Sequence, residues 1–181
     1  MIDAAEIEVK QPVFSAFEDL LRYCGQARGA FCCLLGGLSG GPDQTVDRAA
    51  YKLGQTLRLT EILIQIQKDP RYGAIYMPKN DLQSYKIDIG HLMKGEVPSQ
   101  LTDLIQAYTG TTSGMYEEFF KLLPAHVLEQ QRALFIQARL GQASLVYARS
   151  KNRKRLELHP LRKLWIAWKA AREAALTSSP K

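Results

Sequence analysis

Residues 53–78 read LGQTLRLTEILIQIQKDPRYGAIYMP and carry the clearest pattern in the chain. Their apolar side chains recur at steps of three and four residues, which places them on one face of an α-helix. The helix that this pattern predicts covers residues 45–69. It ends there because Pro70 disfavours helical geometry at the residue before it. The predicted apolar face consists of Leu53, Leu57, Ile62, Leu63 and Ile66.

Helical periodicity extends over most of the remaining chain. A first helix is expected from Ser15, which would cap it in a capping box with Glu18, as far as the glycine-rich residues 36–42. Residues 71–95 are expected to be irregular, with two short helical turns at most, one of them capped by Asn80. Strand-type alternation is absent, so the predicted fold class is all-α, a helical bundle. The later helices are predicted at residues 99–123, with a loose stretch at 109–114, at residues 124–150 and at residues 160–177.

Length and composition bound the domain organisation. The chain has 181 residues, of which 46% are hydrophobic and 23% charged, and this fits one soluble globular domain. We expect a single helical domain over residues 1–176 and a disordered tail over residues 177–181. No apolar run reaches the roughly 18–20 residues that span a bilayer, and no signal peptide is recognisable. The predicted location is therefore cytoplasmic, with peripheral contact to the inner membrane as an alternative.

The formal charge of +6 is concentrated near the C-terminal end, because residues 149–172 hold nine basic residues against one acidic residue. Nucleic-acid binding is disfavoured, because neither aromatic interleaving nor a recognised nucleic-acid fold accompanies these charges. Two other interpretations stay open. Either the segment forms an amphipathic helix that lies on anionic lipid, or its two tryptophans close the bundle core and its charges are solvated. The apolar residues of this pattern are Leu161, Leu164, Trp165 and Trp168, flanked by Arg162, Lys163, Lys169 and Arg172.

Polar residues on the central helix have the spacing of metal ligands. Glu61, Gln65 and Asp69 stand at i, i+4 and i+8, so they share one helix face, and oxygens are the ligands that Mg²⁺ prefers. A solvated polar stripe on an amphipathic helix is the alternative. Asp43 and Asp47 form a second acidic pair, but they follow a Gly/Pro loop. There Asp43 or Thr45 would cap the helix, and Asp47 would favour its first turn through the helix dipole.

The remaining reactive residues favour no other enzyme class. His91, His126 and His159 are scattered, and no serine or cysteine stands beside them in the sequence, so a nucleophilic triad has no support. The chain has no GxxxxGK[ST], GxGxxG or CxxC motif. Its three cysteines are odd in number and lack histidines at metal spacing, which favours buried reduced thiols.

Residues 53–78 resemble the second signature of the squalene and phytoene synthase family, which reads approximately LGxAxQLTNILRDVxEDxRRGRIYLP. Upstream, residues 23–29 are similar to the YCYxVAGxVG helix of that family. Downstream, residues 80–82 match the segment that follows IYLP, and residues 123–147 are similar to the later helices. These blocks keep the family order across most of the chain.

The resemblance implies an isoprenoid-synthase-type helical bundle, in which two aspartate-rich helices face each other across an apolar cavity. In such enzymes Mg²⁺ ions bridge those aspartates to allylic diphosphates, and two prenyl chains condense head to head. If active, this chain would be a Mg²⁺-dependent prenyltransferase of the farnesyl or geranylgeranyl diphosphate transferase type. The implied catalytic residues are Glu61, Asp69, Arg71 and Tyr76, with Glu61 and Asp69 as metal ligands. The implied substrate-binding residues are Tyr23, Gly29, Leu57 and Gln65.

The chain departs from the family pattern at its acidic positions. The asparagine of QLTN is Glu61, the aspartate of RD is Gln65, and only the last aspartate is kept, as Asp69. Tyr72 and Ala74 stand where the family has arginines. The chain begins just ahead of the YC helix. We therefore expect a fold that is truncated at the N-terminus, lacks the first aspartate-rich motif and has a degenerate second one.

Two functional hypotheses follow from these departures. The first is a squalene/phytoene synthase-like protein of isoprenoid biosynthesis that binds prenyl diphosphate and is weak or inactive alone. A homo-oligomer or a complementing protein chain would then complete its site, because a fold that lacks helices exposes apolar faces. The alternative is a non-catalytic module that keeps the fold in order to bind an isoprenoid or another lipid, or to support assembly.

Overall fold

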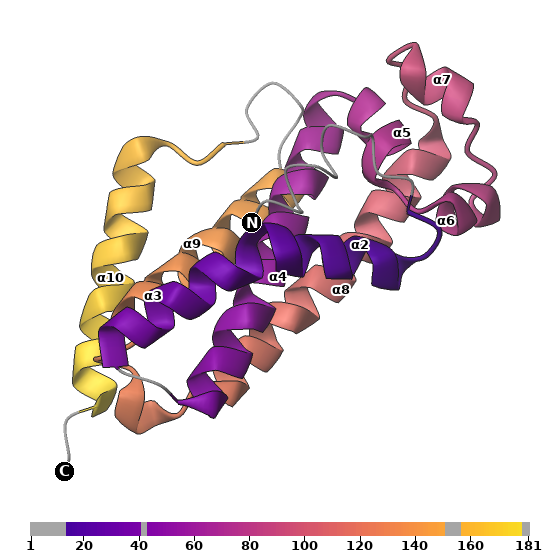
Figure 1. Ribbon diagram of the computed structural model, residues 1–181. Helices are drawn as coiled ribbons and strands as arrows, with labels where there is room; N and C mark the ends of the chain where they lie inside the picture. The colour runs from indigo at the N-terminus through magenta and orange to yellow at the C-terminus, as the bar shows by residue number, and fades with distance from the viewer. Residues whose placement is uncertain (1–13, 41–42, 151–156, 179–181) are drawn as a thin grey trace.

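The computed structural model describes residues 14–40, 43–150 and 157–178, and within these ranges every regular element is a helix (Figure 1). The all-α prediction is confirmed. In chain order the elements are α2 (Phe17–Cys24), the π-helical turn η1 (Gly25–Gly29), α3 (Ala30–Gly40), α4 (Gln44–Lys68), α5 (Arg71–Tyr76), α6 (Lys79–Ser84), α7 (Ile89–Met93), α8 (Ser99–Leu122), the 3₁₀ turn η2 (Ala125–Val127), α9 (Arg132–Ser150) and α10 (Pro160–Ser178).

Helix α4 is the centre of the bundle. It contacts α2, η1 and α3 as well as α8 and α9, and it runs through the middle of the molecule in Figure 1. Leu53 and Leu59 are both fully buried, although their side chains point about 120° apart around the helix axis. A helix that is buried on more than one side belongs in the core. The apolar face predicted from the sequence is buried as well, with 6% exposure or less at Leu53, Leu57, Ile62, Leu63 and Ile66.

The ends of α4 follow local sequence signals. At its N-terminus, Asp43 Oδ1 accepts hydrogen bonds from the backbone N–H groups of Thr45 at 2.7 Å and Val46 at 3.2 Å, which confirms Asp43 as a cap. At its C-terminus, Asp69 is extended, as the following proline requires. The helix therefore starts and ends within one residue of the prediction.

Helix α2 is capped by a different residue from the one expected. Ala16 occupies the N-cap position, and Asp19 Oδ2 accepts hydrogen bonds from the N–H groups of Ser15 and Ala16, each at 3.2 Å. The predicted capping box of Ser15 and Glu18 is wrong, because the next carboxylate along the chain reaches back to these N–H groups.

The glycine-rich end of α3 remains helical as far as Gly40, against the prediction that glycine would end the helix near Gly36. The Gly36 carbonyl accepts a hydrogen bond from Gln131 Nε2 at 3.0 Å. A Cβ atom at Gly36 would lie 3.2 Å from the Val46 side chain, so the position is closely packed. Packing against α4 and α9 therefore offsets the low helix propensity of glycine.

Three short helices, α5 to α7, occupy the stretch that was expected to hold two at most. The third is capped by Asp88, whose Oδ1 accepts a backbone N–H at 2.9 Å. Asn80, predicted to cap one of these turns, lies inside α6 instead. Pro70 precedes α5, Pro78 precedes α6 and the Asp88 carboxylate caps α7. These local signals start more helices in this segment than its weak hydrophobic periodicity indicates.

The later helices differ from the prediction at their ends. Helix α8 is continuous through residues 109–114. Helix α9 begins at Arg132 rather than at Pro124, because a 3₁₀ turn follows that proline. Helix α10 includes Thr177 and Ser178, which were expected to belong to a disordered tail. The last three residues of that tail lie outside the described residues.

Two glycines set the distance between α4 and η1. A Cβ atom at Gly54 would lie 2.5 Å from the Cα atom of Gly29, and a Cβ atom at Gly29 would lie 2.6 Å from the ring of Tyr51. Neither position accepts a side chain without displacing its neighbours. Gly29, which the resemblance placed at a substrate cavity, is instead buried in this helix contact.

The cysteines are buried or half-buried and form no disulfide. Cys24 and Cys32 are buried, as predicted, whereas Cys33 is only half-buried. That all three are reduced stays a prediction. Burial raises the pKa of Cys24 to about 12 and that of Cys32 to about 11. Both thiols therefore stay protonated, and weakly nucleophilic, at neutral pH.

We expect Gly54→Ala to lower the free energy of unfolding by about 3 kcal/mol, because the added methyl group meets backbone atoms of η1. Gly110→Ala is the matched control, since Gly110 is also helical but has nothing within 4 Å of its Cβ position. The control should gain about 0.5–1 kcal/mol from helix propensity. Urea denaturation followed by circular dichroism measures both, and equal stability of the two variants would contradict the close contact.

Candidate functional site

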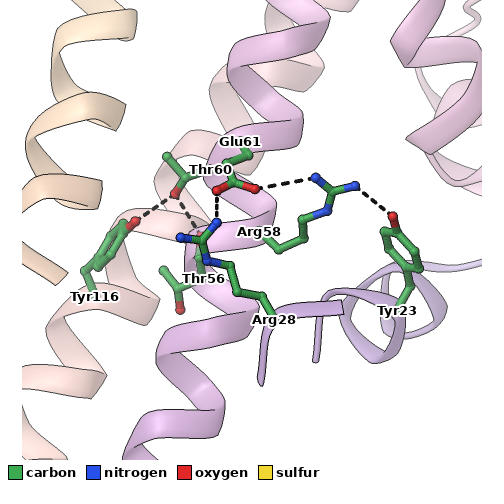
Figure 2. A network of polar contacts seen from close by, with 7 residues as sticks. All are labelled: Tyr23, Arg28, Thr56, Arg58, Thr60, Glu61 and Tyr116. Carbon is green, nitrogen blue, oxygen red and sulfur yellow. Dashed lines mark hydrogen bonds and ion pairs between the residues drawn. The ribbon is translucent and has the colours of Figure 1, made fainter. Parts of the chain in front are cut away.

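Glu61 lies between two arginines near the middle of α4 (Figure 2). Arg28 Nη1, from η1, donates a hydrogen bond to Glu61 Oε1, and Arg58 Nη1, one turn earlier on α4, lies 3.4 Å from Glu61 Oε2. The three side chains are partly buried, with exposed fractions between 22% and 41%. Each oxygen of the carboxylate therefore faces a guanidinium group, which balances its charge.

Two tyrosines hold Arg58 from its other side. Arg58 Nη2 donates a hydrogen bond to the Tyr23 hydroxyl at 2.8 Å (Figure 2). The guanidinium carbon lies 5.6 Å from the ring centroid of Tyr23 and 5.8 Å from that of Tyr76, within the range of cation–π contacts. Tyr23 and Tyr76, predicted as substrate-binding and catalytic residues, are thus brought together around an arginine.

A second chain of polar contacts lies on the buried side of α4. Thr60 Oγ1 donates a hydrogen bond to the Thr56 carbonyl at 2.8 Å and lies 2.9 Å from the hydroxyl of Tyr116 on α8. Burial raises the pKa of Tyr116 above its usual range, so the hydroxyl stays neutral and can donate to Thr60. Helix α9 crosses at Gly141, where a Cβ atom would lie 2.2 Å from that hydroxyl. These contacts hold α4, α8 and α9 together.

A cavity of about 360 Å³ opens between α4 and α9 beside Glu61. Its volume lies within the range of about 300–1,000 Å³ that is typical of small-molecule sites. The wall combines apolar side chains with basic and acidic ones. The apolar residues include Leu57, Ile64 and Leu140, and the basic residues are Arg28, Lys68 and Lys163.

The two carboxylates of the cavity wall are both paired with cations. Glu61 is held by arginines, and Glu157 pairs with Lys68. With three basic and two acidic residues, the wall has a formal charge of +1. The cavity is therefore weakly positive, although one of its acidic residues was predicted to bind a metal ion.

Three of the eight predicted site residues line the cavity and the other five do not. Leu57, Glu61 and Gln65 line the cavity, because they share one face of α4. The five that do not line it are Tyr23, Gly29, Asp69, Arg71 and Tyr76.

Asp69 lies at the C-terminal end of α4, where Arg71 holds its carboxylate. Arg71 Nε lies 3.0 Å from both carboxylate oxygens, and Nη2 lies 2.7 Å from Oδ2. These hydrogen bonds, and one from the Arg71 backbone N–H, lower the pKa of Asp69. The two residues thus form a local ion pair at the helix end.

The predicted metal ligands do not fit a Mg²⁺ site. Magnesium needs several carboxylate or water oxygens around it, but Glu61 faces two arginines and Asp69 faces a third. Within the described part of the chain, no three His, Cys, Asp or Glu side chains gather closely enough to hold a metal ion. The Mg²⁺ cofactor therefore stays a prediction.

Sequence reasoning missed the two arginines beside Glu61. Arg58 stands three residues before Glu61, a helical spacing that could have indicated the ion pair. Arg28 is 33 residues away from Glu61 in sequence, and no local signal indicates this contact. Arg28 reaches Glu61 because η1 lies directly against α4.

Comparison with known proteins identifies the family. Residues 1–166 match the family model of squalene/phytoene synthase. The chain belongs to the squalene/phytoene synthase family. Within this family, the phytoene synthase of Thermus thermophilus is 30% identical over 100 residues, which cover 55% of this chain and 34% of that protein. The phytoene synthase of Mycobacterium tuberculosis is 26% identical over 191 residues, which cover 99% of this chain and 62% of that protein.

The fold is shared with a solved dehydrosqualene synthase, crystallised in complex with a ligand. The two structures agree with a TM-score of 0.71 at 24% sequence identity, over 92% of this chain and 60% of that one. The predicted isoprenoid-synthase-type bundle is therefore confirmed. This family member spans between 34% and 62% of the length of the relatives named here.

The Arg28–Glu61 contact predicts a measurable coupling. We expect Arg28→Gln and Glu61→Gln together to cost less than the sum of the single changes, with a coupling of about 1 kcal/mol, because both groups are only partly buried. Urea denaturation of the four proteins measures it. Lys52→Gln with Glu118→Gln, a more exposed pair at 2.8 Å, is the matched cycle and should show a smaller coupling. Zero coupling in the first cycle would contradict the contact.

Proposed function

We propose that this family member binds a prenyl diphosphate in the cavity between α4 and α9, and that a single chain is weak or inactive in head-to-head condensation. The observation that carries the proposal is the position of Glu61 in the cavity wall, with both carboxylate oxygens engaged by arginines. The ligand class comes from the family, whose curated relatives named above are phytoene synthases.

The cavity has partners for both ends of such a ligand. Leu57, Ile64 and Leu140 form an apolar wall against which a prenyl tail gains from leaving water. Arg28 Nε is buried and has no hydrogen-bond partner among the described residues. A buried donor without a partner costs free energy, so an oxygen of the diphosphate that accepts this hydrogen bond is stabilising. Lys163 adds a positive charge to the same wall, whereas Lys68 is already paired with Glu157.

Weak condensation follows from the charges at the site. The departing diphosphate must be stabilised by cations, and family members gather Mg²⁺ ions for this with carboxylates. Here Glu61 is already neutralised by Arg28 and Arg58, and Gln65, one turn further along the cavity wall, carries no charge. The residues of this chain are thus better suited to holding a diphosphate than to cleaving it from the prenyl chain.

An exposed face of α3 supports a role for a complementing chain. Phe31, Leu34 and Leu38 share this face and are 50%, 62% and 87% exposed. Contiguous apolar surface of this kind marks contacts with other protein. We assign the α3 face to helices of the family fold that this chain does not span, since the solved relative is covered over 60% of its length. Such helices would bring the carboxylates that a condensing site needs.

Titration calorimetry with farnesyl thiodiphosphate, which does not react, tests the binding site. We expect Arg28→Gln to weaken binding roughly 10-fold, because it removes a charge-assisted hydrogen bond and leaves Glu61 less well balanced. Arg22→Gln is the matched control, since Arg22 is 68% exposed and does not line the cavity, and it should bind as the unchanged protein does. No binding of the analogue to the unchanged protein would overturn the proposed site.

Product formation from labelled farnesyl or geranylgeranyl diphosphate, with and without Mg²⁺, tests the activity. We expect at most traces of condensed product from the chain alone, and rapid turnover would overturn this part of the proposal.

Sedimentation velocity tests the α3 face, because a dimer that Leu38→Glu weakens would assign this face to a second copy of the chain. Equal binding of farnesol and the thiodiphosphate, both insensitive to Arg28→Gln, would favour the non-catalytic lipid-binding alternative.

A further inference from the structure

Helix α10 turns its small side chains to the bundle and its large apolar ones to solvent. Ala170 and Ala174 are 2% and 0% exposed where α10 packs on α9, whereas Trp165 and Trp168 are 57% and 59% exposed. A helix that merely completes a bundle shows the opposite distribution. The interpretation in which the tryptophans close the core is therefore wrong. The large exposed apolar residues of α10 are Leu161, Leu164, Trp165, Trp168 and Leu176.

These five residues form one continuous surface, which we call the outer face of α10. The first four follow one another at steps of three, one and three residues, so they lie on one side of the helix, with Trp165 at its edge beside the groove between α9 and α10. Leu176 follows two turns later. From Leu161 to Leu176 the outer face runs for about 22 Å. Figure 1 shows α10 at the edge of the bundle, beside α9, and the exposures show that no described element covers its outer face.

Positive charges border the outer face. Lys169 Nζ lies 5.4 Å from the ring centroid of Trp165, and the Arg172 guanidinium carbon lies 5.3 Å from that of Trp168. These cation–π contacts hold the charges at the level of the indole rings. The single carboxylate within α10, Glu173, is paired with an arginine of α9 at 2.6 Å. The outer face thus combines apolar rings with one sign of charge.

We propose that the outer face of α10 docks on the surface of a lipid bilayer that contains anionic lipids. Tryptophan favours the membrane interface because its ring is apolar and its N–H group is polar. Lysine and arginine reach the anionic headgroups while their aliphatic stems lie against the apolar layer. None of the described helices is long and apolar enough to cross a membrane. The contact is therefore one of a helix lying in the plane of the interface.

The distribution of charge favours lipid over protein as the occupant. The α3 face has no charged residue between Phe31 and Leu38, as is typical of the core of a protein interface. The outer face of α10 is instead flanked by cations, which suit a headgroup layer.

Docking on this face would bring the cavity close to the membrane. Lys163, in the first turn of α10, and Leu158, just before it, line the cavity between α4 and α9. The helix that contacts the lipid is thus also part of the cavity wall. This consequence rests on the proposed function, whereas the docking itself does not.

Intrinsic fluorescence tests the proposal, because Trp165 and Trp168 are the only two tryptophans of the chain. We expect phosphatidylcholine vesicles with about one third phosphatidylglycerol to shift the emission to the blue, and brominated lipids to quench it. Vesicles of phosphatidylcholine alone should have a much smaller effect. Added salt should weaken the binding, because it screens the attraction between the basic residues and the headgroups.

Charge variants separate lipid docking from a merely structural role of α10. We expect Lys169→Gln with Arg172→Gln to lower the partition into anionic vesicles about 30-fold, while both tryptophans remain as reporters. Arg22→Gln with Arg48→Gln removes the same charge from exposed positions outside α10 and should leave the partition unchanged. Circular dichroism checks that both double variants are folded. Trp165→Ala with Trp168→Ala, followed by co-sedimentation with vesicles, tests the apolar part of the contact and should also lose binding.

Three results would overturn the proposal. The first is an emission spectrum that anionic vesicles leave unchanged. The second is equal vesicle binding by the α10 charge variant and its control, which would reject recognition by charge. The third is a blue shift that grows with protein concentration without lipid, together with a dimer mass in sedimentation equilibrium. That result would make the outer face an interface between two copies.

Discussion

The close contact between α4 and η1 is the constraint on which the site depends. Gly54 and Gly29 let the two backbones touch, and a Cβ atom at Gly54 would lie only 2.5 Å from the Cα atom of Gly29. Arg28 directly precedes Gly29, so this contact brings its guanidinium to Glu61. The same contact buries α4, around which α8 and α9 pack. A larger residue at either glycine would separate the ion pair as well as the helices.

Charge balance around Glu61 is the second constraint on the site. Glu61 replaces the asparagine of the family signature, and a partly buried carboxylate without partners would be costly. Arg28 and Arg58 remove that cost, and Tyr23 holds Arg58 in place. The result is a cavity wall whose two carboxylates are both paired with cations.

Helices α9 and α10 pack on the bundle through small residues, and α10 exposes its large apolar residues to solvent. Gly141 brings α9 onto Tyr116, and Ala170 and Ala174 bring α10 onto α9. Because these contacts use small side chains, the tryptophans and leucines of α10 are left on the surface. The helix is therefore amphipathic in the sense that suits a membrane interface, and its first turn remains part of the cavity wall.

The helices of this protein follow from local interactions that can be read in its sequence. The order of its sequence motifs likewise indicates its family. The bounds of α4 follow from periodicity, the Asp43 cap and Pro70, all of which act within a few residues. For the same reason Leu57, Glu61 and Gln65 could be placed on one face, since they share a helix. Local signals failed at Gly36 and at Pro124, where packing and a 3₁₀ turn changed the helix ends.

Only the tertiary structure decided which charges meet at the site. Arg28 and Glu61 are 33 residues apart, and their contact depends on how closely two backbones approach. It also decided that Gly29 belongs to a helix contact and that the tryptophans of α10 face outward. The physical reason is that side chains from different segments meet only after the core has packed, and no periodicity within one segment encodes that distance.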